Sequence, residues 1–193
     1  MAQQEDETKR QRRLMHRRTI ECEGYLRDDG LWEVEARLVD AKPFPMPTRY
    51  RGLLQAGDPV HDIRLRLAVD DTLTIHEAEA SMHAAPYPTC VQVEPVLQRL
   101  VGERIGKGWH KLIRQKLGKL ESCTHLSELL GPAATTLFQT IAMGRTPERR
   151  DPLADHQGAT KPPFFVNGCH SWRSDGPIVA ELFPQFATQA TKE

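Results

Sequence analysis

Cysteine and histidine are the residue types of this chain best suited to chemistry, and several of them stand at the ends of predicted elements. Cys123 opens Cys-Thr-His-Leu, the start of the longest stretch with helical spacing. A thiol at a helix N-terminus lies near unpaired N–H groups and the positive end of the helix dipole, which favour the thiolate. His125 follows two residues later, although residues two apart do not share a helix face. Cys123 is therefore the first candidate for a metal ligand or nucleophile.

Further donors precede a strand and end a loop. His61 and Asp62 stand at the start of an alternating segment, and Cys90 ends a proline-rich loop. If these ends converge with the Cys123 segment, sulfur, imidazole and carboxylate donors come together, a mixture that suits zinc or iron. No C-x-x-C or H-E-x-x-H spacing is present to fix that geometry. We predict a metal site formed by His61, Asp62, Cys90, Cys123 and His125.

The other two cysteines have weaker claims to a function. Cys22 lies in the middle of a predicted strand, where a cysteine is usually a small core residue. Cys169 and His170 either join the site or are an ordinary pair of turn residues.

The N-terminal half alternates apolar and polar residues, which is typical of antiparallel strands with one wet face. Segments 19–26 and 31–39 flank an Asp-Gly turn and predict a hairpin. Segments 62–69 and 73–80 predict a second strand pair. The buried face is expected to carry Ile20, Trp32, Val34, Leu38, Ile63, Leu65, Leu67 and Val69.

Beyond residue 93 the apolar spacing changes to three and four, which predicts helices over 94–101, 108–117 and 123–143. Gly131-Pro132 predicts a kink or a new helix start in the last of these. Segments 164–166 and 178–180 flank Ser-Asp-Gly and predict a C-terminal hairpin.

We therefore predict an α+β fold in which helices cover one face of an antiparallel meander, with additional hairpins at both ends. The predicted organisation is a basic flexible arm (1–18), one α+β domain (19–144), a polar proline-rich loop (145–163), and a C-terminal hairpin and tail packing on the same domain (164–193).

Composition excludes several classes of protein. The 193 residues carry 26 Lys+Arg and 26 Asp+Glu, and this balance argues against a nucleic-acid or anionic-lipid footprint over the whole surface. No window approaches the roughly 20 apolar residues of a membrane span, and no signal peptide is visible, so we expect a cytoplasmic protein without a membrane partner. Four scattered cysteines argue against a disulfide framework, and no nucleotide-cofactor motif is present. The expected partner is therefore an unidentified protein or small molecule.

Four segments resemble the bacterial family known as domain of unknown function 2889: E-G-Y-L-R-D-D-G-L-W (23–32), R-G-L-L-Q-A-G-D-P-V-H-D (51–62), A-A-P-Y-P-T-C (84–90) and C-T-H-L-S-E-L-L-G-P-A-A-T-T-L-F-Q-T (123–140). The resemblance covers most of the chain. It implies a family and no particular function.

The order of elements is also similar to NifU-like and SufE-like scaffolds for iron–sulfur cluster assembly. In NifU-like proteins three cysteines and an aspartate hold the metal. The resemblance implies that His61 takes the aspartate position, Cys90 the middle cysteine and Cys123 the last one. The first cysteine has no counterpart here, which implies zinc or mononuclear iron in place of a cluster, or no metal at all.

Three functions are compatible with these patterns. The first is a scaffold-like protein that binds a metal (zinc, iron or an iron–sulfur centre) at a Cys/His site. The second is an enzyme that uses Cys123 as thiolate nucleophile or sulfur carrier, with His125 or His61 as base. The third is a non-catalytic binding module whose cysteines belong to the core.

Overall fold

The computed structural model describes residues 11–142, 153, 156 and 158–188. It contains two compact units, residues 1–141 and 142–193, which are considered separately. Among the described residues, no helix is both long and apolar enough to cross a membrane.

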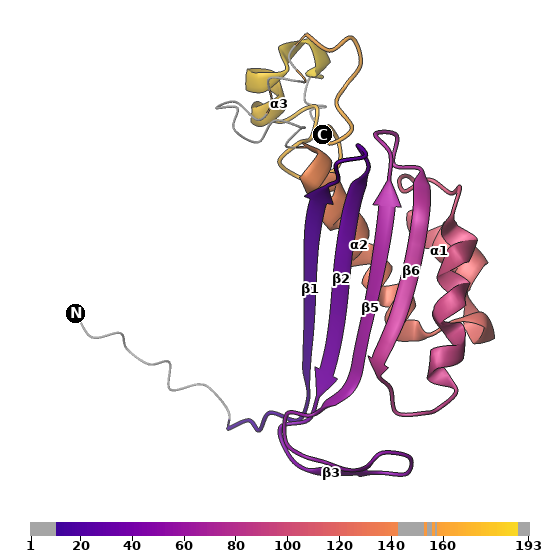
Figure 1. The fold of residues 1–193 in the computed structure, drawn as a ribbon. Helices are drawn as coiled ribbons and strands as arrows, with labels where there is room; N and C mark the ends of the chain where they lie inside the picture. Colours follow the sequence, from indigo (N-terminus) through magenta and orange to yellow (C-terminus); the bar gives the residue numbers. More distant parts are fainter. Residues whose placement is uncertain (1–10, 143–152, 154–155, 157, 189–193) are drawn as a thin grey trace. The chain divides into compact units, whose positions relative to one another are not determined.

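The first unit is built on a four-stranded antiparallel sheet in the order β1-β2-β5-β6 (Figure 1). Its strands are β1 (Arg17–Leu26), β2 (Trp32–Ala41), β5 (Pro59–Val69) and β6 (Ile75–Ala84). The predicted N-terminal hairpin is confirmed, and it forms half of this sheet. The strand pair β3 (Met46–Thr48) and β4 (Gly52–Leu54) lies in the connection from β2 to β5.

The first turn forms as the Asp-Gly step predicts. Gly30 has a φ of 87°, a conformation that costs glycine little because it lacks a Cβ. Its N–H donates to the carbonyl of Arg27, and the N–H of Arg27 donates to the carbonyl of Leu31. These bonds join β1 to β2 in a register that pairs Leu26 with Trp32.

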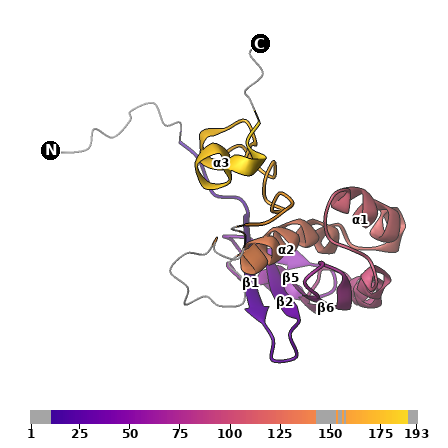
Figure 2. The ribbon, with the colours of Figure 1, turned by 90° about the horizontal axis from the view of Figure 1, so that it is seen from above.

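Helices cover one face of the sheet (Figure 2). They are the 3-10 helix η1 (Cys90–Leu100), α1 (Trp109–Leu117), the short η2 (Lys119–Glu121) and α2 (Thr124–Ala142). α2 continues through Pro132 as one helix, so the prediction of a new helix start there is wrong. The core lies between the two layers and combines strand residues such as Leu38 and Leu67 with Leu126 and Leu130 of α2.

The predicted buried face is correct except at its edge. All of its predicted members on β2 and β5 are buried, whereas Ile20 on β1 is 40% exposed. β1 is an edge strand of the sheet, and all its residues are exposed except the half-buried Cys22. Its start at Arg17 also places the last two residues of the predicted arm in the sheet, while residues 1–10 lie outside the described part.

The predicted C-terminal hairpin is wrong. Residues 164–166 form turns, and Pro177–Leu182 form helix α3, followed by the 3-10 helix η4 (Pro184–Phe186). Pro177 occupies the start of α3, where a fixed φ suits the first helical turn and no N–H is needed. The packing of this segment on the first domain remains a prediction, and most of the predicted loop 145–163 lies outside the described residues.

Candidate metal centre

The candidate site begins with two residues that face each other across neighbouring strands. Asp40 of β2 is the register partner of His61 of β5. Both continue the row of helix-facing positions that contains Leu38 and Ile63, because side chains two apart on a strand share a face. The helix-facing surface of the sheet therefore changes from apolar to polar at this end of β2 and β5.

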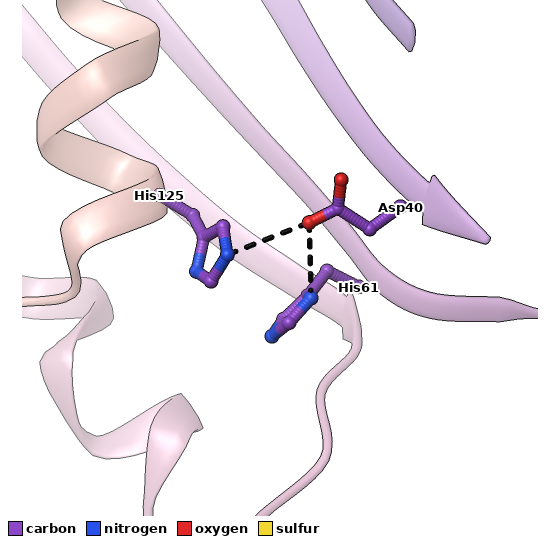
Figure 3. A group of neighbouring side chains, drawn as sticks. All are labelled: Asp40, His61 and His125. Atoms are coloured by element: carbon purple, nitrogen blue, oxygen red, sulfur yellow. Dashed lines mark ion pairs between the residues drawn. The ribbon is translucent and has the colours of Figure 1, made fainter. Parts of the chain in front are cut away.

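Helix α2 supplies the third residue, His125, from its first turn. His125 Nε2 lies 3.4 Å from Asp40 Oδ2, and His61 Nδ1 lies 3.2 Å from the same oxygen. Figure 3 shows both rings turned toward that oxygen. The two rings lie with centroids 4.0 Å apart. In the described part of the chain, these three residues form the one group of cysteine, histidine or acidic side chains close enough to share an ion.

Arg18 and His16 hold the other side of the Asp40 carboxylate. Arg18 donates from Nε to Oδ1 and from Nη2 to Oδ2, each over 2.8 Å, and His16 Nε2 lies 3.0 Å from Oδ1. Burial alone raises the pKa of Asp40, but the hydrogen bonds and charge of Arg18, with His16, outweigh it and lower the pKa to about 2. Asp40 is therefore a carboxylate at neutral pH although its side chain is only 2% exposed.

His61 presents an unsatisfied nitrogen to this carboxylate. Among the described residues, its buried Nδ1 has no hydrogen-bond partner, although it lies 3.2 Å from Asp40 Oδ2. Burial lowers the pKa of His61, the charge of His125 lowers it further, and Asp40 opposes both. A neutral imidazole is the form of histidine that binds metals.

Two separations fit ligands of one small ion, and all three ligand atoms lie within 4.8 Å of one another. Ligands about 2.0–2.1 Å from a tetrahedral zinc ion are about 3.3–3.4 Å from one another. The observed separations from Asp40 Oδ2, 3.2 Å and 3.4 Å, agree with this spacing. The residues present therefore fit a metal ion that prefers imidazole and carboxylate ligands.

The structure brings together two of the five predicted site residues, His61 and His125. Asp62 points to the opposite face of the sheet, where Arg37 donates to both of its oxygens over 2.8 Å; this hydrogen bonding lowers the pKa of Asp62. Cys123 lies beside the site, with Sγ 3.6 Å from His125 Nδ1. Cys90 is half-buried against the core and does not belong to the Asp40 group.

Cys22 and Cys169 also lie outside the group. Cys22 packs partly buried against the core, as predicted for a structural cysteine, and burial raises the pKa of its thiol. Cys169 is exposed in the second unit.

Sequence reasoning misses Asp40, Arg18 and His16. The predicted strand 31–39 stops one residue before Asp40, although its alternation, extended by one step, places Asp40 on the buried face. A buried carboxylate needs a cation, and Arg18 supplies it from the directly paired position on β1. Arg18 and His16 fall within the predicted basic arm because their charges resemble those of a solvated tail.

These features define an α+β protein with a one-sided, four-stranded antiparallel sheet and an Asp-His-His cluster at its end. Residues 16–139 match the family described as Protein of unknown function (DUF2889), and the chain belongs to this family. The matched region includes Asp40, His61 and His125. No curated protein and no solved structure matches the chain, so the NifU-like topology gains no support from these comparisons.

Proposed function

We propose that this protein binds one divalent transition-metal ion, zinc or iron(II), through Asp40 Oδ2, His61 Nδ1 and His125 Nε2. The observation that carries the proposal is that two imidazole nitrogens approach a single buried carboxylate oxygen at the spacing of ligands around one ion. The Nδ1 of His61, which makes no hydrogen bond within the described part of the chain, supports it, because a buried nitrogen without a hydrogen bond is costly unless something binds it.

The donor set favours zinc or iron(II) over calcium or magnesium. Calcium and magnesium bind chiefly oxygen ligands, whereas imidazole suits zinc and iron. Two histidines and one carboxylate form the protein ligands of several catalytic zinc sites and of the facial triad of non-haem iron(II) enzymes. Both kinds of site leave at least one coordination position for an external ligand.

The ion pair with Arg18 is compatible with metal binding. Each carboxylate oxygen has two lone pairs. Arg18 Nε and His16 Nε2 together occupy those of Oδ1, while Arg18 Nη2 occupies one of Oδ2. One lone pair of Oδ2 therefore remains for the metal, so Asp40 would bind through a single oxygen.

In this proposal the predicted cysteines are not ligands. Cys123 contacts the ring nitrogen of His125 that faces away from Asp40 and so helps to orient the ring. Such partners commonly fix the tautomer of a metal-bound histidine.

Metal titration of the purified full-length protein tests the proposal. The protein, prepared without a metal-affinity tag and stripped with chelator, is titrated with Zn²⁺ or anaerobic Fe²⁺, and bound metal is measured by elemental analysis after gel filtration. We expect about one ion per chain. His61→Ala and Asp40→Asn should lose this ion, whereas Asp62→Asn and Cys90→Ser should keep it.

Asp62→Asn is the matched control for Asp40→Asn, because Asp62 is also a buried, arginine-paired carboxylate but faces the other side of the sheet. Circular dichroism verifies that each variant is folded. Less than about 0.2 ion per wild-type chain, or full binding by folded His61→Ala, would overturn the proposal.

A second candidate function, chemistry at the Cys123 thiol, is favoured by one contact. Cys123 Sγ lies 3.6 Å from His125 Nδ1, and His125 Nε2 lies 3.4 Å from Asp40 Oδ2. Nucleophile, base and orienting carboxylate stand in this order in thiol enzymes.

The labelling rate of Cys123 by iodoacetamide, measured by mass spectrometry, tests this second function. The exposed Cys169 serves as a comparison within the same molecule. We expect Cys123 to react faster than Cys169, and His125→Gln to remove the difference. His61→Ala should leave it unchanged, which separates thiol chemistry from metal binding. A Cys123 rate no greater than that of Cys169 would exclude an activated thiol.

A further inference from the structure

We propose that the open coordination position of the metal binds a small oxyanion, such as a carboxylate or phosphate, and that Arg18 binds the same anion. This inference rests on the proposed metal site and adds the chemical class of its ligand. Its basis is the position of a partly exposed guanidinium on the carboxylate that would hold the ion.

The site is closed toward the core and open toward solvent. The Asp40 side chain is 2% exposed, whereas those of His61 and His125 are 17% and 24% exposed. No further cysteine, histidine or acidic side chain of the described residues joins the three. An external ligand would therefore complete the coordination of the ion from the solvent side.

Arg18 has hydrogen-bonding capacity to spare. A guanidinium carries five N–H groups, and within the described part of the chain three of those of Arg18 bind acceptors: Asp40 Oδ1, Asp40 Oδ2 and Glu128 Oε2. One N–H on each Nη group is thus left, and the Arg18 side chain is 35% exposed.

The distance from Arg18 to the proposed ion suits a bridging anion. Nη2 lies 2.8 Å from Asp40 Oδ2, the oxygen that would bind the metal. With a metal–oxygen bond of about 2.0–2.2 Å, the ion and Nη2 would be roughly 4 Å apart. One oxyanion can span that distance with one oxygen on the metal and another on the guanidinium, and such charge-assisted hydrogen bonds are strong.

Electrostatics at this end of the sheet also favour an anion. Segment 11–18 leads into β1 and includes its first two residues, and segment 42–58 connects β2 to β5. Both therefore adjoin the end of the sheet that holds Asp40 and His61 (Figure 1). Together they contain seven Lys and Arg residues and one Asp. Arg51 donates to the carbonyls of Pro59 and Val60, immediately before His61. A cationic surround raises the local concentration of anions.

Glu128 has the opposite effect on the site. Its Oε2 accepts a hydrogen bond from Arg18 Nη1 over 2.7 Å, and its side chain is 52% exposed. The carboxylate therefore occupies one donor of Arg18 and repels an approaching anion. Removing its charge should strengthen anion binding.

Cobalt(II) makes the open position visible, because its absorption spectrum changes with its ligands. The full-length protein is loaded with Co²⁺ and titrated separately with acetate and inorganic phosphate at constant ionic strength. We expect a saturable spectral change with at least one of these anions, and the comparison shows which oxyanion the site prefers.

Three variants assign the role of Arg18. We expect Arg18→Lys to weaken anion binding about tenfold while keeping one Co²⁺ per chain, because lysine retains the charge but not the fork of donors. Glu128→Gln should strengthen anion binding. Arg17→Lys is the matched control, since Arg17 is an exposed neighbour on the other face of β1.

The outcomes distinguish this inference from the metal site itself. If wild-type protein binds no Co²⁺, both proposals fall. If it binds one Co²⁺ but neither anion changes the spectrum, only the anion site is overturned. If an anion changes the spectrum but its affinity is unchanged in Glu128→Gln and in Arg18→Lys that retains its Co²⁺, the anion binds the metal without Arg18, and the role given to Arg18 is overturned.

Discussion

Asp40 and His61 lie directly opposite each other on β2 and β5, with 3.2 Å between Oδ2 and Nδ1. The preceding pair on the same face, Leu38 and Ile63, is buried and apolar. One step along the sheet thus separates the hydrophobic core from a carboxylate–imidazole contact. Such a contact inside the helix-covered layer has to be balanced electrostatically, by Arg18 on one side and, in our proposal, by a metal ion on the other.

Metal addition should stabilise the fold. An ion that binds only the folded state at a free concentration of 100 times its dissociation constant raises the unfolding free energy by about 2.7 kcal/mol. We expect Zn²⁺ to raise the melting temperature of the wild-type protein by at least about 5 °C. Scanning fluorimetry with added Zn²⁺, and then with excess chelator, measures the shift and its reversal.

As a control, the change in melting temperature on adding Zn²⁺ is measured separately for each variant. His61→Ala should show no Zn²⁺-dependent shift, whatever its own melting temperature, and Cys90→Ser should shift as the wild type does. Equal shifts in His61→Ala and wild type would mean that Zn²⁺ stabilises the fold at another place.

The strands are predictable because their signals are local. Alternation on either side of Asp29-Gly30 predicts the hairpin and the buried face of β2, although not that of the edge strand β1, and alternation from Ile63 to Val69 predicts the buried face of β5. The C-terminal hairpin is predicted wrongly because that prediction also relies on a local signal. Its Ser-Asp-Gly turn leads into a helix that starts at Pro177, and the same turn signal can precede either a strand or a helix.

The candidate site is only partly predictable. His61 and His125 are found from their places at element ends, but their convergence depends on how α2 crosses the sheet. The sequence favours Asp62 over Asp40 because Asp62 adjoins His61, although adjacent strand residues point to opposite faces. The pairing of Asp40 with Arg18 needs the register of β1 and β2, which links residues 22 apart.

Loss of Arg18 should destabilise the protein through Asp40. Arg18→Met leaves the buried carboxylate without its guanidinium, and we expect a loss of about 2–3 kcal/mol in unfolding free energy at pH 7. Adding Asp40→Asn removes the unpaired charge, so the double variant should be less destabilised than the sum of the two single ones. Urea denaturation of metal-free protein measures all four forms.

Arg17→Met, at the exposed neighbouring position, is the control and should change stability by less than about 0.5 kcal/mol. A loss from Arg18→Met as small as that of the control would show that the ion pair contributes little to the fold.

Gly24 allows α2 to approach the edge strand closely. A Cβ added at Gly24 would overlap Thr140 Oγ1 and lie 2.9 Å from Thr140 Cβ. We therefore expect Gly24→Ala to cost about 1–3 kcal/mol in unfolding free energy. Thr140→Ala in the same chain removes the hydroxyl and methyl groups, so the double variant should recover part of the loss.

Gly106→Ala is the matched control for this contact, because an added Cβ there meets nothing within 4 Å. Its unfolding free energy, measured in the same urea titrations, should stay within about 0.5 kcal/mol of wild type. A Gly24→Ala variant as stable as Gly106→Ala would mean that α2 and β1 separate readily at this point.

Asp70 should make stability depend on pH, far from the site. It accepts hydrogen bonds from the backbone N–H groups of Thr72 and Thr74 in the turn between β5 and β6, and Leu73 in that turn has a φ of 65°. The hydrogen bond with His76, followed by those with Thr72 and Thr74, holds the pKa of Asp70 well below its usual range. The native state therefore favours the charged form.

A carboxyl group whose pKa is depressed on folding stabilises the native state above its unfolded pKa, about 3.9, and loses that effect as the pH falls toward its folded pKa. We expect Asp70→Asn to lower the unfolding free energy by about 1 kcal/mol at pH 6, a figure already reduced because the Asp70 side chain is 35% exposed. The difference in unfolding free energy between this variant and wild type should shrink steadily below pH 4. Urea titrations at pH 6, 4, 3 and 2 measure it, with Asp28→Asn in the exposed β1–β2 turn as control. A difference that grows below pH 4 would contradict the assigned direction, because it would mean that folding favours the protonated carboxyl.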